Sequence, residues 1–425
     1  MNRLLGASEH AIWLFDQIAP LHFALMARII GEFSIAQLEQ ALIEVQQQHP
    51  MLRVGIAPDE SEQPWFVEDA AHIPLRVVER QEEQHWQQEV ERELFHPFNW
   101  AQAPLLRVVL LQSTDSSKRV SEIIVTCHHS IGDGLSSAYL LRDILQALSS
   151  PAEQRSPLSE HPPFEDLIPQ KVSTPQSVET AANESEDTPP APLLSTEAAL
   201  SQPFAPQLLS WSLSFEETAS IIAHCRQEQT TVHAAICAAF LLAIANEGET
   251  RSPQTYPLKC LSSINLRKYL SPPIQEEFGF YAWAEMTSHP SISDLGLWEI
   301  ARSLKEQLNQ KMSINKIFGD IPARQALMST SPSSSMMWQL YAEQYRYELL
   351  VSNLGYLNFF PQFGQLQLEA IYGPATMSTF RENHGVIGVA TVQGRMFFTL
   401  TYSGTEMSPD QAEQFQQKAM RSLLA

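Results

Sequence analysis

The chain is poor in cysteine and in basic residues. It has four cysteines in 425 residues, and no two of them form a CxxC pair (Cys127, Cys225, Cys237 and Cys260). This pattern argues against a structural zinc site and a disulfide scaffold, and it favours a reducing compartment. Lys and Arg number 27 against 48 Asp and Glu, so the formal net charge is −21. We therefore expect no nucleic-acid partner, because such binding needs clustered basic residues.

Long apolar runs are also missing. No stretch of about 18 apolar residues occurs, so we expect no membrane span. The N-terminus has a single basic residue, Arg3, before Glu9 and His10, and no apolar segment of signal-peptide length follows. These absences predict a cytoplasmic protein.

The length and the composition divide the chain into three parts. A chain of 425 residues is too long for one ordinary core, so we expect two lobes. Prolines and acidic residues concentrate between residues 149 and 207, which predicts a crossover linker in which Pro162-Pro163-Phe164 could dock locally. The expected organisation is an N-terminal lobe over 1–148, a linker over 149–207 and a C-terminal lobe over 208–425.

Periodicity and turn signals predict several elements. Ser34 and Gln37 form a capping-box pattern that opens a helix ending before His49-Pro50. The β-branched run from Val120 to Cys127 predicts a buried strand, and residues 135–148 predict a helix. Later in the chain, we expect a strand that ends at Asn353-Leu354-Gly355, and a hairpin with Gln393-Gly394 as its turn.

The most specific feature is His128-His129-Ser130-Ile131-Gly132-Asp133-Gly134, which lies between the predicted strand and the predicted helix. A histidine can accept a proton near neutral pH, and a strand end holds it rigidly. Gly132 and Gly134 permit a tight reversal, and Asp133 could bind a cation or orient an imidazole. His128 should point away from His129, because successive side chains alternate on an extended segment.

Other interpretations of these residues are open. His128, His129 and Asp133 could bind a metal, but no further ligand is evident, so we expect none. Cys127 could be a nucleophile, although a thiol inside an apolar run is usually inert. His129 could also be an ordinary loop histidine.

The motif resembles the His-His-x-x-x-Asp-Gly signature of the acyltransferase superfamily that includes chloramphenicol acetyltransferase and nonribosomal condensation domains. Further similarity extends along the chain, at His49-Pro50-Met51-Leu52-Arg53, Ser263 to Arg267 with Phe278-Gly279, and Val351 to Gly355. The chain looks most similar to the polyketide-associated and alcohol O-acyltransferases. The DFGWG motif of the plant enzymes has no good match, which argues against that branch.

The resemblance implies an α/β fold of two chloramphenicol-acetyltransferase-like lobes with a tunnel between them. It implies that His129 is the general base, with His128, Asp133 and Gly134 as the other motif residues of the catalytic site. Arg267 matches an arginine that pairs with the motif aspartate. The Gly134 amide, Ser352 and Asn353 are candidates to bind the oxyanion or the substrate.

The function that we expect is transfer of an acyl group from a thioester to a hydroxyl group, in natural-product or lipid metabolism. The donor would be acyl-coenzyme A or a phosphopantetheinyl carrier protein, and the acceptor a small molecule; no permanently bound cofactor is expected. A basic patch for the donor could include Arg267, Lys268, Arg381 and Arg395. Amide-forming condensation and a non-catalytic docking role are alternatives. We expect a monomer, because two fused lobes complete one site.

Overall fold

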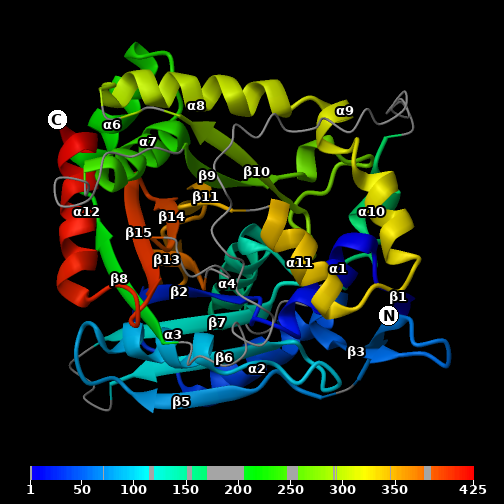
Figure 1. Cartoon of the computed structure of the whole chain (residues 1–425). Helices are drawn as coiled ribbons and strands as arrows, with labels where there is room; N and C mark the ends of the chain where they lie inside the picture. The colour runs from blue at the N-terminus through cyan, green and yellow to red at the C-terminus, as the bar shows by residue number, and fades with distance from the viewer. Residues whose placement is uncertain are drawn as a thin grey trace.

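Two mixed sheets form the framework of the molecule (Figure 1). The computed structural model describes residues 2–69, 71–113, 119–150, 156–169, 205–246, 257–290, 292, 294–344, 346–377 and 384–425. The first sheet has the strand order β12-β13-β2-β7-β6-β5, and the second has the order β10-β9-β11-β14-β15-β8. A small sheet of order β1-β4-β3 lies near the N-terminus. The expected α/β class is confirmed.

The strands have the following bounds. Those of the first sheet are β2 (His22–Ile30), β5 (Leu75–Glu79), β6 (Leu106–Gln112), β7 (Val120–His128), β12 (Gln362–Phe363) and β13 (Leu366–Thr376). Those of the second sheet are β8 (Pro206–Ser212), β9 (Leu258–Asn265), β10 (Ala282–His289), β11 (Leu349–Leu357), β14 (Val386–Val392) and β15 (Arg395–Ser403). The small sheet contains β1 (Arg3–Leu4), β3 (Val54–Pro58) and β4 (Pro64–Glu68).

Helices cover both sheets, and α4 lies in the centre of the view in Figure 1. The first lobe contains α1 (Ala7–Asp16), α2 (Ile35–Gln48), α3 (His85–Phe95) and α4 (Gly134–Ser149). The second contains α6 (Phe215–Gln227), α7 (Val232–Ala245), α8 (Leu297–Lys311), α9 (Ile314–Ile317), α10 (Ile321–Met328), α11 (Ser334–Gln344) and α12 (Pro409–Leu424). Short 3₁₀ helices are η1 (Pro50–Arg53), η2 (Phe164–Leu167) and η4 (Arg267–Tyr269).

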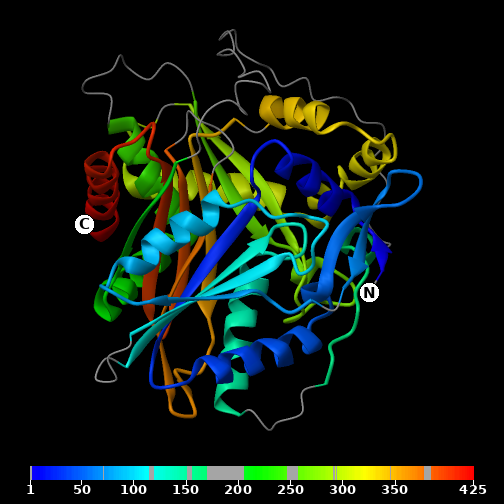
Figure 2. The same cartoon turned by 90° about the horizontal axis from the view of Figure 1, so that it is seen from below.

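The β7 strand is apolar on both faces because both faces of its sheet are covered. Ile123, Val125 and Cys127 point into the core that contains α2 and α4. Ile124 points to the other side, where it packs with Trp86 and other residues of α3. Figure 2 shows α2, α4 and α3 around this sheet. The motif therefore follows an interior strand that pairs with β2 and β6 and is covered on both faces of the sheet.

Several local predictions are confirmed. Ser34 and Gln37 form the capping box of α2. Gln393 and Gly394 both have positive φ (51° and 78°), as a two-residue hairpin turn between β14 and β15 requires.

The strand predicted to end at Asn353-Leu354-Gly355 is longer than expected. It continues to Leu357, and its register with β14 shifts between Asn353 and Tyr356. Gly355 has a φ of +72°, a conformation that glycine adopts without steric cost, so the chain passes through an irregularity instead of stopping.

Strands from late in the sequence complete the first sheet. β13 pairs antiparallel with β2, and β12 extends that edge, although both lie beyond residue 208. The second sheet meets them closely at Gly388 of β14, where an added Cβ would lie 2.2 Å from the Pro374 carbonyl oxygen. The two sheets are therefore tied by exchange of strands as well as by the linker.

No single described helix is both long enough and apolar enough to cross a membrane. Only α6 and α7 pass that test as a pair, and they are bent by 98° at the break between them.

Gly388→Ala should weaken the contact between the sheets, because the methyl group would meet the rigid backbone of Pro374 at 2.2 Å and of Gly373 at 2.9 Å. We expect the free energy of unfolding in urea to fall by about 1–3 kcal/mol, as for other overpacked sites. Gly404→Ala is the matched control, because its added Cβ would meet the flexible Gln207 side chain at 2.9 Å. Equal stability of the two variants would contradict this account of the contact.

Candidate active site

The loop from His128 to Asp133 joins the end of β7 to the start of α4, as predicted. Its backbone is held on both sides. The His129 amide donates to the Leu21 carbonyl at 3.0 Å, and the Ile131 amide donates to the His128 carbonyl at 3.2 Å. Gly132 must be glycine, because an added Cβ would lie 2.8 Å from the Phe278 ring. These contacts fix the direction of the two imidazoles.

The His129 ring is half-buried and fixed in one tautomer. Its Nδ1 lies 3.0 Å from the Gly132 carbonyl oxygen, which can only accept, so Nδ1 carries the proton and donates. Nε2 is then unprotonated, and it has no hydrogen-bond partner among the described residues. Burial lowers the pKa of His129 below 6.5, and the Gly132 carbonyl and the Asp133 charge offset this only in part. The ring is therefore a neutral base at neutral pH.

Two phenylalanine rings enclose the imidazole. The ring centroids of Phe23 and His129 are 4.8 Å apart, and those of His129 and Phe280 are 5.4 Å apart in an edge-on arrangement. Phe23 is 1% exposed, whereas Phe280 is half-buried. The base thus stands in an apolar surrounding contributed by both lobes.

His128 faces the opposite way and is fully buried. The Ser130 amide donates to its Nδ1 at 3.2 Å, so the proton of the neutral ring is on Nε2, which lies 3.3 Å from Asp16 Oδ2. Asp16 also accepts from the Leu21 amide at 2.5 Å and from Trp100 Nε1 at 2.6 Å. The geometry gives His128 a structural place in the first lobe.

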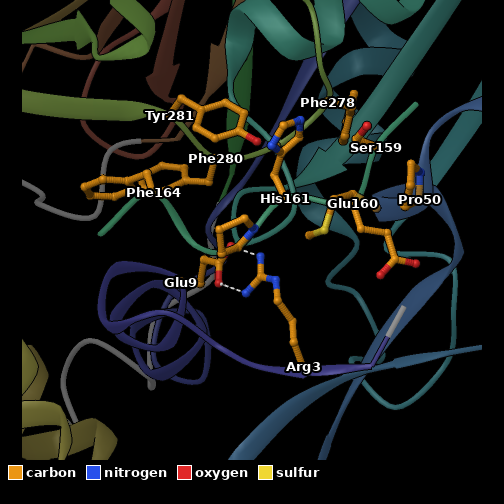
Figure 3. Close-up of a pocket in the computed structure, with 13 residues that line it drawn as sticks. Arg3, Glu9, Pro50, Ser159, Glu160, His161, Phe164, Phe278, Phe280 and Tyr281 are labelled. Carbon is orange, nitrogen blue, oxygen red and sulfur yellow. Dashed lines mark hydrogen bonds and ion pairs between the residues drawn. The ribbon is translucent and has the colours of Figure 1, made fainter. Parts of the chain in front are cut away.

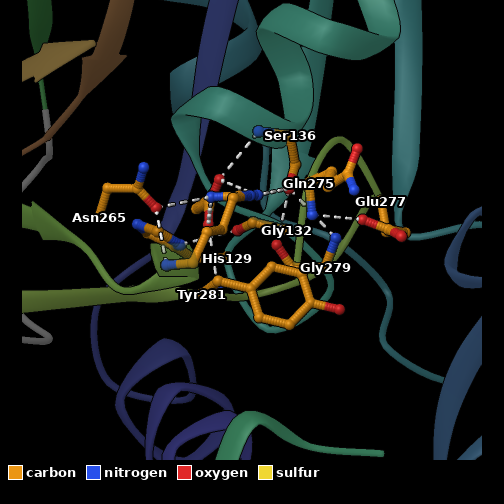
Figure 4. A network of polar contacts seen from close by, with 10 residues as sticks. His129, Gly132, Ser136, Asn265, Gln275, Glu277, Gly279 and Tyr281 are labelled. Carbon is orange, nitrogen blue, oxygen red and sulfur yellow. Dashed lines mark hydrogen bonds and ion pairs between the residues drawn. The ribbon is translucent and has the colours of Figure 1, made fainter. Parts of the chain in front are cut away.

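Asp133 accepts hydrogen bonds from both lobes. Figure 4 shows the polar network around it, with Ser136, Asn265 and Tyr281 labelled. The Asp133 carboxylate caps α4 by accepting from the Ser136 amide at 2.9 Å. Arg267 donates to both carboxylate oxygens, at 2.9 and 3.0 Å, and the Tyr281 amide donates to Oδ2 at 2.9 Å. Burial alone would raise the pKa of Asp133, but Arg267 and these donors hold it below 3.8. Asp133 is therefore a permanent carboxylate that does not face His129.

Second-lobe residues extend this network. Ser136 Oγ accepts from Arg267 Nη2 at 2.7 Å and donates to the Gly279 carbonyl at 2.7 Å. Asn265 Oδ1 accepts from the Arg267 amide at 3.0 Å. Sequence reasoning missed Ser136, Asn265 and Tyr281. Ser136 could have been found, because the third helical residue after a capping aspartate is the usual partner of the cap.

Gly134 is the first residue of α4, so its amide has no partner inside the helix. It also has no hydrogen-bond partner elsewhere among the described residues, which leaves it free to bind an oxyanion. An added Cβ at Gly134 would lie 2.7 Å from Pro374 and 2.8 Å from the Leu354 side chain. The helix start is thus packed directly against β11 and β13.

The structure does not join Ser352 and Asn353 to this network. Both are half-buried on β11, and the Asn353 side chain accepts from the Gly355 amide at 2.8 Å. Their neighbour Leu354 makes the contact with Gly134. Arg267 is 4% exposed and engaged with Asp133, so it cannot belong to a basic patch for a donor, and Arg381 lies outside the described residues.

The geometry gives little support to Cys127 as a nucleophile or to a metal site. Burial raises the pKa of the Cys127 thiol, and its Sγ donates to the His128 carbonyl at 3.3 Å, so a reactive thiolate is disfavoured. Within the described ranges, no group of three or more His, Cys, Asp or Glu side chains is arranged to hold a metal ion.

Comparison with known proteins identifies the family. The condensation-domain model matches residues 12–250, more than half of the chain. This chain belongs to the condensation-domain family. Residues 202–405 match the model of the phthiocerol/phthiodiolone dimycocerosyl transferase C-terminus. The two matches together span residues 12–405.

Curated relatives are large synthetases. Phosphinothricin tripeptide synthetase PhsB from Streptomyces viridochromogenes is 28% identical over 152 residues, which are 33% of this chain and 12% of that protein. Tyrocidine synthase 2 from Brevibacillus parabrevis is 31% identical over 127 residues, which are 29% of this chain and 3% of that protein. The match thus spans only a small part of these relatives.

Solved structures share the fold over nearly the whole chain. The epimerization domain from the third module of tyrocidine synthetase B has a TM-score of 0.70 at 15% identity, over 100% of this chain and 96% of that one. Polyketide synthase associated protein 5 from Mycobacterium tuberculosis has a TM-score of 0.65 at 16% identity, over 99% and 96%. Trichothecene 15-O-acetyltransferase from Fusarium sporotrichioides has a TM-score of 0.67 at 14% identity, over 100% and 94%.

Asp133→Asn should lower the free energy of unfolding by about 3–5 kcal/mol, because it leaves the buried Arg267 without a counter-charge. Asp133→Asn combined with Arg267→Met should be less destabilising than the sum of the two single changes. Because the pKa of Asp133 is lowered by folding, its contribution is present above pH 3.8 and is lost as the pH falls through the folded-state pKa.

Urea unfolding at pH 7 measures these effects. The matched control is Glu228→Gln, which breaks an exposed ion pair with Arg302 and should cost less than about 1 kcal/mol. Additive effects of the two changes at Asp133 and Arg267 would contradict a coupled buried pair.

Proposed function

We propose that this chain transfers an acyl group from a thioester to the hydroxyl group of a small molecule, with His129 as the general base. The observation that carries the proposal is the fixed tautomer of His129. The Gly132 carbonyl holds the proton on Nδ1, and Nε2 stays free to accept one. The family relationship supports a transferase, and the match to the acyltransferase C-terminus supports the hydroxyl acceptor.

In the proposed reaction, Nε2 of His129 removes the proton of the acceptor hydroxyl group while its oxygen attacks the thioester carbonyl carbon. The carbonyl oxygen becomes an oxyanion, for which the free Gly134 amide at the positive end of α4 is the proposed donor. Collapse of the intermediate breaks the carbon–sulfur bond, and His129 returns the proton to the leaving thiolate. The products are an ester and a free thiol.

The donor is either acyl-coenzyme A or a phosphopantetheinyl carrier protein, since both present the same thioester. The trichothecene acetyltransferase and the polyketide-associated neighbour support hydroxyl acylation by analogy of fold. Asp133 and Arg267 come from different lobes of one chain and form an ion pair next to the motif loop, which supports a monomer as the active unit.

Amide formation is the second candidate. The condensation-domain model covers the motif-bearing half of the chain, and the curated relatives are peptide synthetases. The same base could remove a proton from an attacking amine. Alcohol and amine acceptors of matched size therefore decide between the two products.

His129→Ala should reduce thiol release at least about 100-fold, because general-base catalysis typically contributes 10²–10⁴-fold. The measurement is thiol release from acyl-coenzyme A and acyl-carrier donors with matched alcohol and amine acceptors. His128→Gln should instead lower the stability of the fold, which thermal unfolding of this variant and of wild type measures. Equal rates for wild type and a folded His129→Ala variant would refute the general-base role.

The pH profile of kcat/KM gives a second test. Since the pKa of His129 lies below 6.5, the base is protonated only in acid. Activity should rise as the pH increases through this lowered pKa and then stay level from about pH 7 to pH 8. A profile that continues to rise above neutrality would be inconsistent with His129 as the titrating group.

A further inference from the structure

An ordered segment of the linker, 156–169, crosses from one lobe to the other, and we call it the strap. At its start, the Leu158 amide donates to the Gln48 carbonyl at the end of α2, at 2.8 Å. Near its end, the Leu167 carbonyl accepts from the Ser271 amide at 2.8 Å. Glu165 Oε1 accepts from the Ser8 amide in the first turn of α1, at 2.7 Å. The strap is thus attached to three separate elements.

Phe164 is the buried centre of the strap and is 1% exposed. Its ring centroid lies 6.2 Å from that of Phe280. Phe280 in turn lies edge-on to His129, with a centroid distance of 5.4 Å. A chain of aromatic contacts therefore runs from the strap to the proposed base.

A small cavity lies under the strap (Figure 3). Phe164, Phe278, Phe280 and Tyr281 line it together with the Arg3–Glu9 ion pair, Glu160 and His161, whereas neither His129 nor Phe23 lines it. Its volume of about 20 Å³ holds about one water molecule, so it is too small for a substrate group. Phe280 is therefore the residue shared by the cavity and the surroundings of the imidazole.

We propose that Phe280, supported by Phe164, determines acceptor size in the acyl-transfer reaction. This inference rests on the proposed function. Any acceptor that donates its proton to Nε2 lies beside the rings that enclose His129. Phe23 is buried under the ring, while Phe280 is half-buried and keeps an accessible surface. Phe280 therefore limits the substituents next to the reacting oxygen, and favours a compact, unbranched acceptor.

Phe280→Ala would remove the ring that both lines the cavity and contacts His129. The competing acceptors are an unbranched primary alcohol and its branched isomer, with one donor that wild type uses. We expect the ratio of kcat/KM for the branched over the unbranched acceptor to rise about tenfold, the usual size of discrimination between such groups in an apolar pocket. Phe280→Leu should shift the ratio in the same direction by less, and it serves where the Ala variant does not fold.

Two control variants test whether a change in the ratio comes from the loss of the ring at position 280. Phe280→Tyr keeps the ring, and Phe318→Ala removes a ring from the same core cluster under the strap, where Phe318 is 1% exposed and does not contact His129. Both should leave the ratio within about twofold of wild type.

The outcomes are distinguishable. An unchanged ratio in Phe280→Ala and Phe280→Leu, with turnover that still depends on His129, would overturn the role of Phe280 and leave the proposed function intact. An equal shift in Phe318→Ala would also overturn it, because loosening of the cluster would then explain the effect. Absence of thiol release by wild type with every donor and acceptor would overturn the proposed function, and this inference with it.

Discussion

The buried ion pair between Asp133 and Arg267 is the interaction on which the rest of the site depends. It joins the start of α4 in one lobe to η4 in the other, and both charges are almost fully buried. Further hydrogen bonds to the two charged groups offset part of the cost of burying them. Ser136 contacts the Arg267 guanidinium, Asn265 contacts the Arg267 amide and the Tyr281 amide contacts Asp133, whereas Arg267 Nε has no partner among the described residues. The relative position of the lobes at this point is thus set by five residues together.

In this site, the ion pair with Arg267 and the orientation of the His129 imidazole depend on different groups. The carboxylate of Asp133 is occupied by Arg267 and does not orient the imidazole of His129. The Gly132 carbonyl does so instead, and a neutral carbonyl fixes the tautomer without stabilising the imidazolium as strongly as a carboxylate would. The base consequently keeps a lowered pKa and remains unprotonated at neutral pH.

Three of the seven residues from His128 to Gly134 have different structural roles. His128 packs into the first lobe against Asp16, His129 contacts Phe280 of the second lobe, and Gly134 lies against the second-lobe side chain of Leu354. The alternation of an extended segment separates the two histidines. The tight packing around Gly132 and Gly134 leaves no space for a Cβ, which explains the residue types at both positions.

Much of the local structure was predictable from the sequence. Capping residues and β-branched runs located α2, β7 and α4 within one or two residues, because these signals act over a single turn or strand. The partner of Asp133 was predicted by resemblance alone. The crossing of β13 into the first sheet was not predicted, since strand pairing over more than 300 residues leaves no local signal.

The sequence by itself determined the motif, the elements that flank it, and the histidine that we propose as the base, because each depends on residue type and short-range spacing. Only the tertiary structure decided which groups surround that base. Phe280 contacts His129, and Tyr281 contacts Asp133, across more than 130 residues of sequence. Both contacts form because β9 ends and β10 begins beside the start of α4. The free Nε2 of His129 and the closed space beside Phe280 are likewise properties of packing between distant segments, which no local pattern encodes.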